Sequence, residues 1–125
     1  MATAMQYIRT GIIVKTERYF DCIEFYRSVL NLKFTSEKVE DDFRMSRFDF
    51  GSSYLLVETG GKAKLGEKDV DENPCVLRLD VEDINLAFEH LKSRSVEADL
   101  YDLDWGKLII THDPDGNRIE ILEPK

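Results

Sequence analysis

HDPDGNRIEILEPK, residues 112–125, predicts a tight turn that leads into a final strand. Proline presets the backbone of the turn, and Gly116 supplies a position with positive φ. In the strand, successive side chains alternate between two faces, so Ile119 and Ile121 share one face and Glu120 lies on the other. We expect the apolar face to pack. Glu120 then projects from the opposite face, where a carboxylate can reach a metal, a substrate or a cation.

The bulk composition predicts one ordinary soluble domain. The chain has 125 residues, of which 42% are hydrophobic and 34% charged, enough for one core. A net charge of −8 argues against a nucleic-acid partner, and no apolar run is long enough to span a membrane. The first residues have neither the basic nor the apolar segment of a signal peptide. Cys22 and Cys75 do not make a disulfide framework, so we expect a cytoplasmic protein.

The order of predicted elements repeats along the chain. Apolar periodicity predicts a strand followed by a helix, three further strands, a polar segment rich in glycine, and then the same series again. The strands are expected over residues 7–15, 32–37, 44–50, 53–59, 75–81, 97–103, 107–112 and 117–123, the helices over about 17–30 and 83–94, and the polar linker over 60–74. The repeat lies in this βαβββ pattern rather than in sequence identity.

Two motifs within this pattern carry a resemblance to a known family. The first is the turn at 113–116 with Glu120, and the second is FYRSVLNL at 25–32, with Asn31 in place of a glycine. The chain resembles the glyoxalase/bleomycin-resistance/extradiol-dioxygenase family (the vicinal oxygen chelate superfamily) over nearly its whole length. The resemblance implies an α+β fold in which paired βαβββ modules form a curved mixed sheet around a cavity, with the helices outside. The single domain, 1–125, then has module one at about 7–59, a linker at about 60–74 and module two at about 75–123.

The same resemblance bears on a metal site. The family takes one metal ligand from each of four strands, usually histidines from the first strands of the modules and glutamates from the last. The glutamate positions fall on Glu58 and Glu120, and the histidine positions fall on Arg9 and Val76. Arginine stays protonated without a free lone pair, and valine has no donor atom. These residues therefore predict no site for zinc, nickel or ferrous iron, which favour imidazole ligands.

We hypothesise that a salt-bridged cluster of Arg9, Glu58 and Glu120, joined by Arg78 and Arg118, replaces the metal, because a guanidinium can satisfy carboxylates as a cation does. Two alternatives stay open: a weak Mg²⁺ or Mn²⁺ site on Glu58 and Glu120 with waters, and plain surface charges on a solvated sheet face. If either glutamate is catalytic, partial burial would raise its pKa toward that of a general base, and a neighbouring arginine would lower it.

The expected ligand is a small organic molecule, anionic or partly aromatic, because guanidinium groups pair bidentately with carboxylates. The residues predicted to bind it are Arg9, Arg78, Arg118, Trp105, Tyr101 and Phe48. His112 is either a proton carrier or an exposed hairpin residue. Neither cysteine has a histidine near it in the sequence, which disfavours a thiol nucleophile.

Three functions remain open at this point. The first is a metal-independent small-molecule binding protein that sequesters an antibiotic or senses a metabolite. The second is a lyase or isomerase of the glyoxalase type that uses Glu58 and Glu120 with a weak divalent metal or with none. The third is an accessory domain without a ligand. The missing histidines argue against lactoylglutathione lyase and ring-cleaving dioxygenase activity, and the resemblance implies a homodimer.

Overall fold

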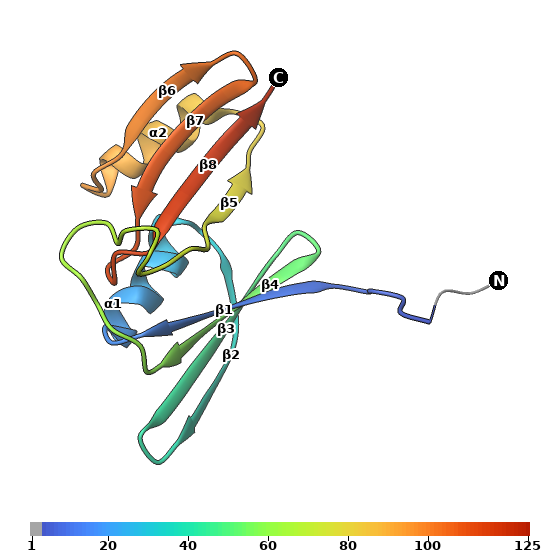
Figure 1. The fold of residues 1–125 in the computed structure, drawn as a ribbon, viewed down its shortest axis with the longest axis vertical. Coiled ribbons are helices and arrows are strands. Elements are labelled where there is room, and N and C mark those ends of the chain that lie inside the picture. The colour runs from blue at the N-terminus through green and yellow to red at the C-terminus, as the bar shows by residue number, and fades with distance from the viewer. Residues whose placement is uncertain (1–3) are drawn as a thin grey trace. The chain divides into compact units, whose positions relative to one another are not determined.

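The chain folds as two compact units of the same design. The computed structural model describes residues 4–125, and the units divide between Lys62 and Ala63. Each has one four-stranded sheet and the element order βαβββ (Figure 1). This architecture confirms the predicted α+β fold with two βαβββ modules. Among the described residues, no helix has the length and apolar character needed to cross a membrane.

The first unit places its first strand parallel to its last. Its elements are β1 (Thr10–Thr16), α1 (Tyr19–Glu24), the π-helical turn η1 (Phe25–Val29), β2 (Lys33–Glu40), β3 (Phe43–Phe50) and β4 (Ser53–Thr59). The sheet order is β1-β4-β3-β2, with β1 parallel to β4 and the other neighbours antiparallel. The crossover from β1 to its distant partner runs through the helix, as a parallel pair requires.

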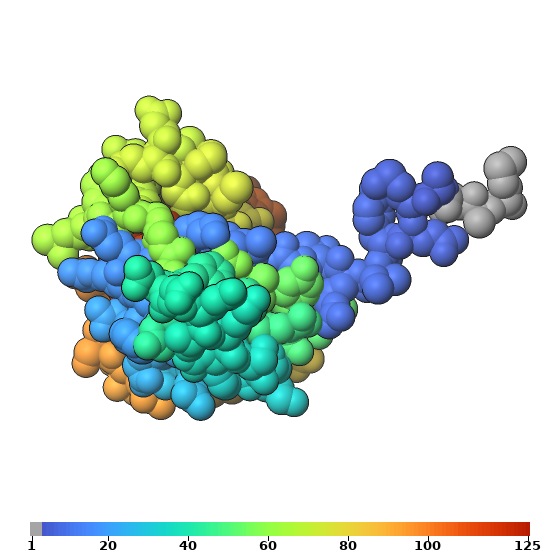
Figure 2. All heavy atoms as spheres, turned by 90° about the horizontal axis from the view of Figure 1, so that it is seen from below, coloured from blue at the N-terminus to red at the C-terminus, as the bar shows by residue number. Residues whose placement is uncertain are grey.

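The predicted strand at 7–15 begins later than expected, at Thr10. Figure 2 shows the segment before β1 standing clear of the rest of its unit. Tyr7 and Ile8 are 81% and 93% exposed, and β4 begins only at Ser53, the partner of Thr10. Because no neighbouring strand extends far enough to pair with it, this apolar stretch does not join the sheet.

The core of the first unit lies between its sheet and its helical segment. Phe48, Leu55 and Val57 are fully buried on the helical side, where the Tyr26 ring lies 6.3 Å from that of Phe48. The Tyr19 hydroxyl hydrogen-bonds to Ser46 on the same side. The other face of the sheet carries charged side chains together with the apolar Ile13, Met45 and Leu56.

The helical segment ends where the sequence predicted. Asn31 takes φ of 58°, the left-handed conformation that closes many helices. The π-helical turn was not predicted: the Leu30 amide donates to the Phe25 carbonyl, 3.0 Å away. A π turn widens the helix by one residue, and such turns are frequent at functional sites.

The second unit repeats the design with a longer helix. Its elements are β5 (Leu77–Asp80), α2 (Ile84–Ser93), β6 (Asp99–Leu103), β7 (Gly106–His112) and β8 (Arg118–Pro124). The sheet order is β5-β8-β7-β6, with β5 parallel to β8. Asp83 caps α2 by accepting from the Asn85 and Leu86 amides. The helix covers the sheet face that carries Ile109, Ile119 and Ile121.

The turn before β8 is held from inside by a buried carboxylate. Asp113 Oδ1 accepts from the Asp115 and Asn117 amides, both at 2.9 Å, and Oδ2 accepts from the Asn117 side chain at 3.0 Å. Because these bonds close the turn, they also fix the residue at which β8 begins.

The segment predicted as a linker belongs largely to the second unit. The Lys64 amide donates to the Asp115 carbonyl at 3.0 Å, and the Lys68 amide donates to the Gly116 carbonyl at 2.8 Å. Asn117 Oδ1 accepts from Lys68 Nζ and from the Asn73 side chain. Residues 63–73 therefore bind the turn at 113–117 rather than spanning freely between the halves.

A substitution at Gly116 can test how closely residues 63–73 pack on this turn. Its φ is 92°, and a β-carbon there would lie 2.5 Å from the Gly66 carbonyl oxygen. Replacing Gly116 with Ala should lower the free energy of unfolding by at least about 2 kcal/mol, because strain and a backbone clash add together. Gly51→Ala is the control, since φ there is also positive but no atom lies within 4 Å. It should cost about 1 kcal/mol. Equal losses in urea unfolding would contradict the packing of 63–73 on the turn.

Candidate functional site

Two arginines enclose Glu120 on the open face of the second sheet. Arg78, its register partner on β5, donates from Nε and Nη2 to Oε1 at 2.9 and 2.6 Å. Arg118, two residues earlier on β8, donates from Nε to Oε2 at 2.9 Å. Glu120 is only 7% exposed, so both carboxylate oxygens are satisfied by guanidinium groups in a nearly buried place. Three members of the cluster hypothesised from the sequence, Glu120, Arg78 and Arg118, are thus in contact.

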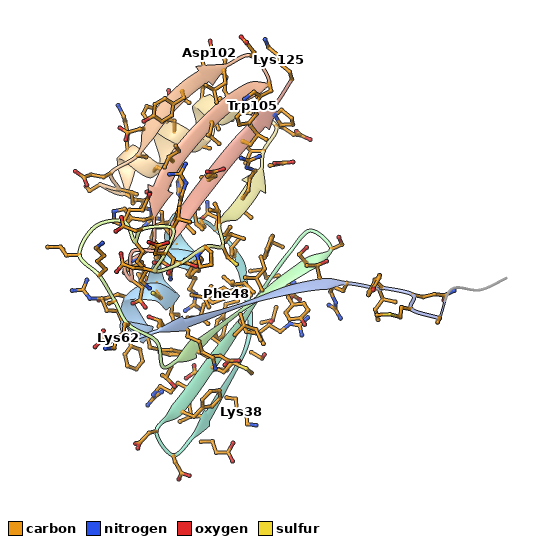
Figure 3. The ribbon with its side chains drawn as sticks, viewed as in Figure 1. Lys38, Phe48, Lys62, Asp102, Trp105 and Lys125 are labelled. Carbon is orange, nitrogen blue, oxygen red and sulfur yellow. The ribbon has the colours of Figure 1, made fainter. Side chains whose placement is uncertain are left out.

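An exposed aromatic ring adjoins this cluster. Trp105 lies in the turn between β6 and β7 (Figure 3), and the Arg78 guanidinium carbon is 5.3 Å from the centre of its ring. Trp105 is 50% exposed and Tyr101, on the same sheet face, is 44% exposed. Arg78 is thus held by a carboxylate and by a π face, an attractive cation–π arrangement, while its side chain stays 46% exposed.

The two guanidiniums set the charge state of Glu120. Burial raises the pKa of this carboxyl, but hydrogen bonds from Arg78 and Arg118 outweigh that effect, so the pKa is lowered. The pKa of Arg118 is raised, since Glu120 and Glu67 outweigh its own desolvation. Glu120 is therefore firmly ionised at neutral pH, which is the opposite of what a general base with a raised pKa requires.

In the first unit, Glu58 pairs with a lysine. The parallel register sets Lys15 opposite Glu58, and Lys15 Nζ donates to Glu58 Oε1. The predicted partner, Arg9, precedes β1 and lies with its guanidinium carbon 5.6 Å from the centre of the Tyr54 ring. The prediction of Arg9 beside Glu58 is wrong, because alternation put Arg9 and Lys15 on one face without fixing which of them meets the glutamate.

Sequence reasoning also missed Tyr54, on which an arginine is stacked. Arg47 lies with its guanidinium carbon 4.4 Å from the centre of the Tyr54 ring, and its Nε donates to Asp49 at 3.0 Å. The tyrosine ring crosses β1 at Gly11, where a β-carbon would lie 2.0 Å from the ring. A glycine inside an apolar strand was the available signal, since it often marks such a close approach.

Phe48 is placed differently from the prediction. It is fully buried on the helical side of its sheet, and the register puts it opposite Leu55, on the face away from Glu58. Figure 3 labels it within the sheet of the first unit. Phe48 is a core residue, which takes it out of the candidate ligand site.

The remaining candidates take no part in either cluster. Val76 precedes β5 and is 44% exposed. His112 Nδ1 lies 3.0 Å from the Asp113 carbonyl, next to the turn. Cys22 is buried with its Sγ 3.3 Å from the Thr16 hydroxyl, and Cys75 is exposed.

The whole pattern from β1 to β8 matches a family model described as Glyoxalase/Bleomycin resistance protein/Dioxygenase superfamily, over residues 12–121. The chain belongs to this superfamily. No curated protein matches its sequence significantly.

Several solved structures of this superfamily's fold resemble the chain. TnmS3, an antibiotic binding protein from Streptomyces sp. CB03234, is 18% identical with a TM-score of 0.73, and the match covers 99% of this chain and 100% of that one. A lactoylglutathione lyase from Agrobacterium tumefaciens is 14% identical with a TM-score of 0.70 and 91% of each chain covered. The fosfomycin resistance protein FosX from Listeria monocytogenes, in complex with Mn(II), is 13% identical, with a TM-score of 0.68 and coverage of 98% and 95%. Such identities show a shared fold, and one fold supports several functions.

The residues predicted to stand at the superfamily's metal positions do not fit a transition metal. Both oxygens of Glu120 accept from guanidiniums, and Glu58 accepts from Lys15. A metal would have to displace these cations and would find no imidazole beside the carboxylates. Across residues 4–125, no group of three or more His, Cys, Asp or Glu side chains is arranged to hold a metal ion.

The cluster around Glu120 gives a pH-dependent prediction. Glu120→Gln should lower the free energy of unfolding at pH 7 by about 1 kcal/mol, because a nearly buried carboxylate loses its charge-assisted contacts with two partly exposed arginines. The pKa of Glu120 is lowered in the folded state, so its contribution is complete above the ordinary glutamate pKa of about 4.3 and disappears as the pH falls through the folded value. The stability difference between the wild type and the variant should therefore shrink below about pH 4.

The control for this series is Asp99→Asn. Asp99 is an exposed carboxylate in the same row of the sheet as Glu120, on the other side of Ile110. Its replacement should change stability by less than about 0.5 kcal/mol. Urea unfolding between pH 3 and 7 measures both effects. A difference for Glu120→Gln that stays constant over this range would show that the carboxylate charge does not support the fold.

Proposed function

We propose that this chain is a small-molecule binding protein of the glyoxalase/bleomycin-resistance type that works without the superfamily's transition metal. The observation that carries the proposal is the neutralisation of Glu120 by Arg78 and Arg118. A carboxylate that already accepts from two guanidiniums has no oxygen left for a metal unless those contacts break. The positive charge that a metal would supply is supplied here by the protein.

The geometry around Arg78 supports an anionic, partly aromatic ligand. Arg78 gives Nε and Nη2 to Glu120, which leaves N–H groups of a half-exposed guanidinium for another acceptor. Trp105 offers an exposed ring beside it. A ligand with a carboxylate on a flat ring would meet a donor and a stacking surface together. TnmS3 is described as an antibiotic binding protein, which fits this class of function.

The alternative function is a lyase or isomerase that uses Glu58 and Glu120, with a weak Mg²⁺ or Mn²⁺ ion or with none. FosX, crystallised with Mn(II), is a relative that suits this alternative. The contacts of Glu120 disfavour it, because a carboxylate with a lowered pKa is a weak base. The resemblance also favours a cytoplasmic protein that forms a homodimer. Light scattering on the purified protein would test the oligomeric state.

Metal content separates the two functions. Untagged protein purified without chelator should contain no stoichiometric transition metal by inductively coupled plasma mass spectrometry. Titration with MnCl₂ should likewise give no saturable heat at pH 7, and Glu120→Gln should not change that result. One bound metal per chain that is lost in Glu58→Gln or Glu120→Gln would overturn the metal-free proposal. It would instead favour the lyase or isomerase that uses both glutamates.

Ligand binding should be visible through Trp105, which is the chain's single tryptophan. Benzoate should change the Trp105 emission and raise the melting temperature by mass action, whereas neutral benzamide should do so weakly. Arg78→Gln should weaken benzoate binding about tenfold, because a charge-assisted contact is lost. Arg94→Gln, at the end of α2, is the control and should leave affinity unchanged. Equal responses to benzoate and benzamide would contradict an arginine contact.

A further inference from the structure

Arg118 contacts two carboxylates that come from distant parts of the chain. Its Nε and Nη2 each lie 2.9 Å from Glu120 Oε2, on the same strand. Its Nη1 donates to Glu67 Oε2 at 3.3 Å, and Glu67 belongs to the segment 63–73. Since Glu120 already holds Arg118 through two nitrogens, the second carboxylate serves a purpose other than fixing the arginine in place.

The backbone on both sides of Glu67 is fixed to the turn at 113–117. The Lys64 amide donates to one carbonyl of this turn at 3.0 Å, and the Lys68 amide donates to the next one at 2.8 Å. Because Arg118 directly follows the turn, these two bonds bring Glu67 within reach of its guanidinium. The Glu67 carboxylate can leave Arg118 by rotation of its own side chain while both backbone bonds stay closed.

The contact of Arg118 with Glu67 is the weaker of its two ion pairs. It is longer than the contact with Glu120, at 3.3 Å against 2.9 Å. The side chain of Glu67 is also 35% exposed, whereas that of Glu120 is 9% exposed. An ion pair open to solvent adds little stability, because water competes for both partners. Glu67 is therefore the carboxylate that an arriving anion can replace.

The charges of the cluster alternate along one line: Arg78, Glu120, Arg118 and Glu67. Two guanidiniums and two carboxylates sum to zero, so the closed cluster has no formal charge with which to attract an anion. When Glu67 turns away, one positive charge is left over and Nη1 of Arg118 is open. A ligand carboxylate at Nη1 would restore both the hydrogen bond and the charge balance.

We propose that Glu67 is a built-in counter-ion that competes with an anionic ligand for Nη1 of Arg118. It covers this group while the site is empty and rotates away when a ligand carboxylate takes its place. The inference rests on the function proposed above, because it concerns the ligand that binds beside Arg78. It adds a selection for ligands with two anionic groups, since one group pairs with Arg78 and the other displaces Glu67.

Titration of the full-length protein with isophthalate, a benzene ring with two carboxylates, tests this proposal. Side-chain NMR follows binding through the Nε–Hε signals of Arg78 and Arg118, which are assigned by their absence in Arg78→Lys and Arg118→Lys. Glu67→Gln should strengthen isophthalate binding about three- to fivefold, the gain expected when a partly exposed competing ion pair is removed. Benzoate, with one carboxylate, should change by less than about 1.5-fold. In an Arg118→Gln background, Glu67→Gln should give no gain for isophthalate.

Glu72→Gln is the matched control. Glu72 lies on the same segment, but its carboxylate accepts from Lys64 Nζ at 2.7 Å rather than from an arginine. The substitution removes the same charge without opening Arg118. It should leave the affinity for isophthalate within about 1.5-fold, because exposed charges act weakly over such a separation at physiological salt.

The outcomes separate this inference from the proposed function. If the wild type binds isophthalate and Glu67→Gln binds it equally well, the inference is overturned and the function stands. Binding by Glu67→Gln alone would support the competing role of Glu67 and contradict the function, since the wild type would then bind neither anion. An equal gain for benzoate or in Glu72→Gln would overturn the inference, because it would show an effect of net charge. No shift of either arginine signal in any variant would overturn both.

Discussion

The carboxylate of Asp113 is the constraint from which the second unit is built. It accepts from two backbone amides and one side-chain amide inside the turn at 113–117, and these bonds hold the turn closed. The closed turn sets where β8 begins, and β8 is the strand that pairs with both β5 and β7. The register that follows brings Glu120 opposite Arg78. The pairing of Glu120 with Arg78 on the sheet face thus depends on the buried carboxylate of Asp113 and on the backbone amides that it binds.

The same device for holding an arginine occurs in both units. In each, a guanidinium lies against an aromatic ring while a neighbouring carboxylate accepts from its Nε: Arg78 with Trp105 and Glu120, and Arg47 with Tyr54 and Asp49. The strands differ, since Arg78 is on the first strand of its unit and Arg47 is on the third. The recurrence therefore reflects the physics of an exposed sheet face rather than a repeated sequence. A guanidinium is stable there when its flat face is covered and its edge is neutralised.

The elements were predictable from the sequence, but the pairings between strands were only partly so. Apolar alternation and turn residues located all eight strands and both helical segments, because these signals act over neighbouring residues. Arg78, Arg118 and Glu120 were found together because Arg118 is two residues from Glu120 and Arg78 lies at the matching place in β5. Lys15 was not recognised as the partner of Glu58. The register between two strands that are distant in the sequence cannot be predicted from the residues of either strand alone. Phe48 was misplaced for a similar reason: alternation gives two faces but does not say which one the helix covers.

The attachment of residues 63–73 to the turn at 113–117 has a consequence for how the chain can be divided. Because that segment is committed to the second unit, the crossing between the units is confined to the residues around Gly60 and Gly61, both with positive φ. A break between Lys62 and Ala63 would leave every strand with its partners. A break near Pro74, at the end of the polar stretch, would instead separate Lys68 and Asn73 from Asn117, to which both donate hydrogen bonds. Chimaeras that exchange halves between relatives, or fragments expressed separately, should therefore be joined or cut at this earlier point, which the polarity of the sequence alone does not mark.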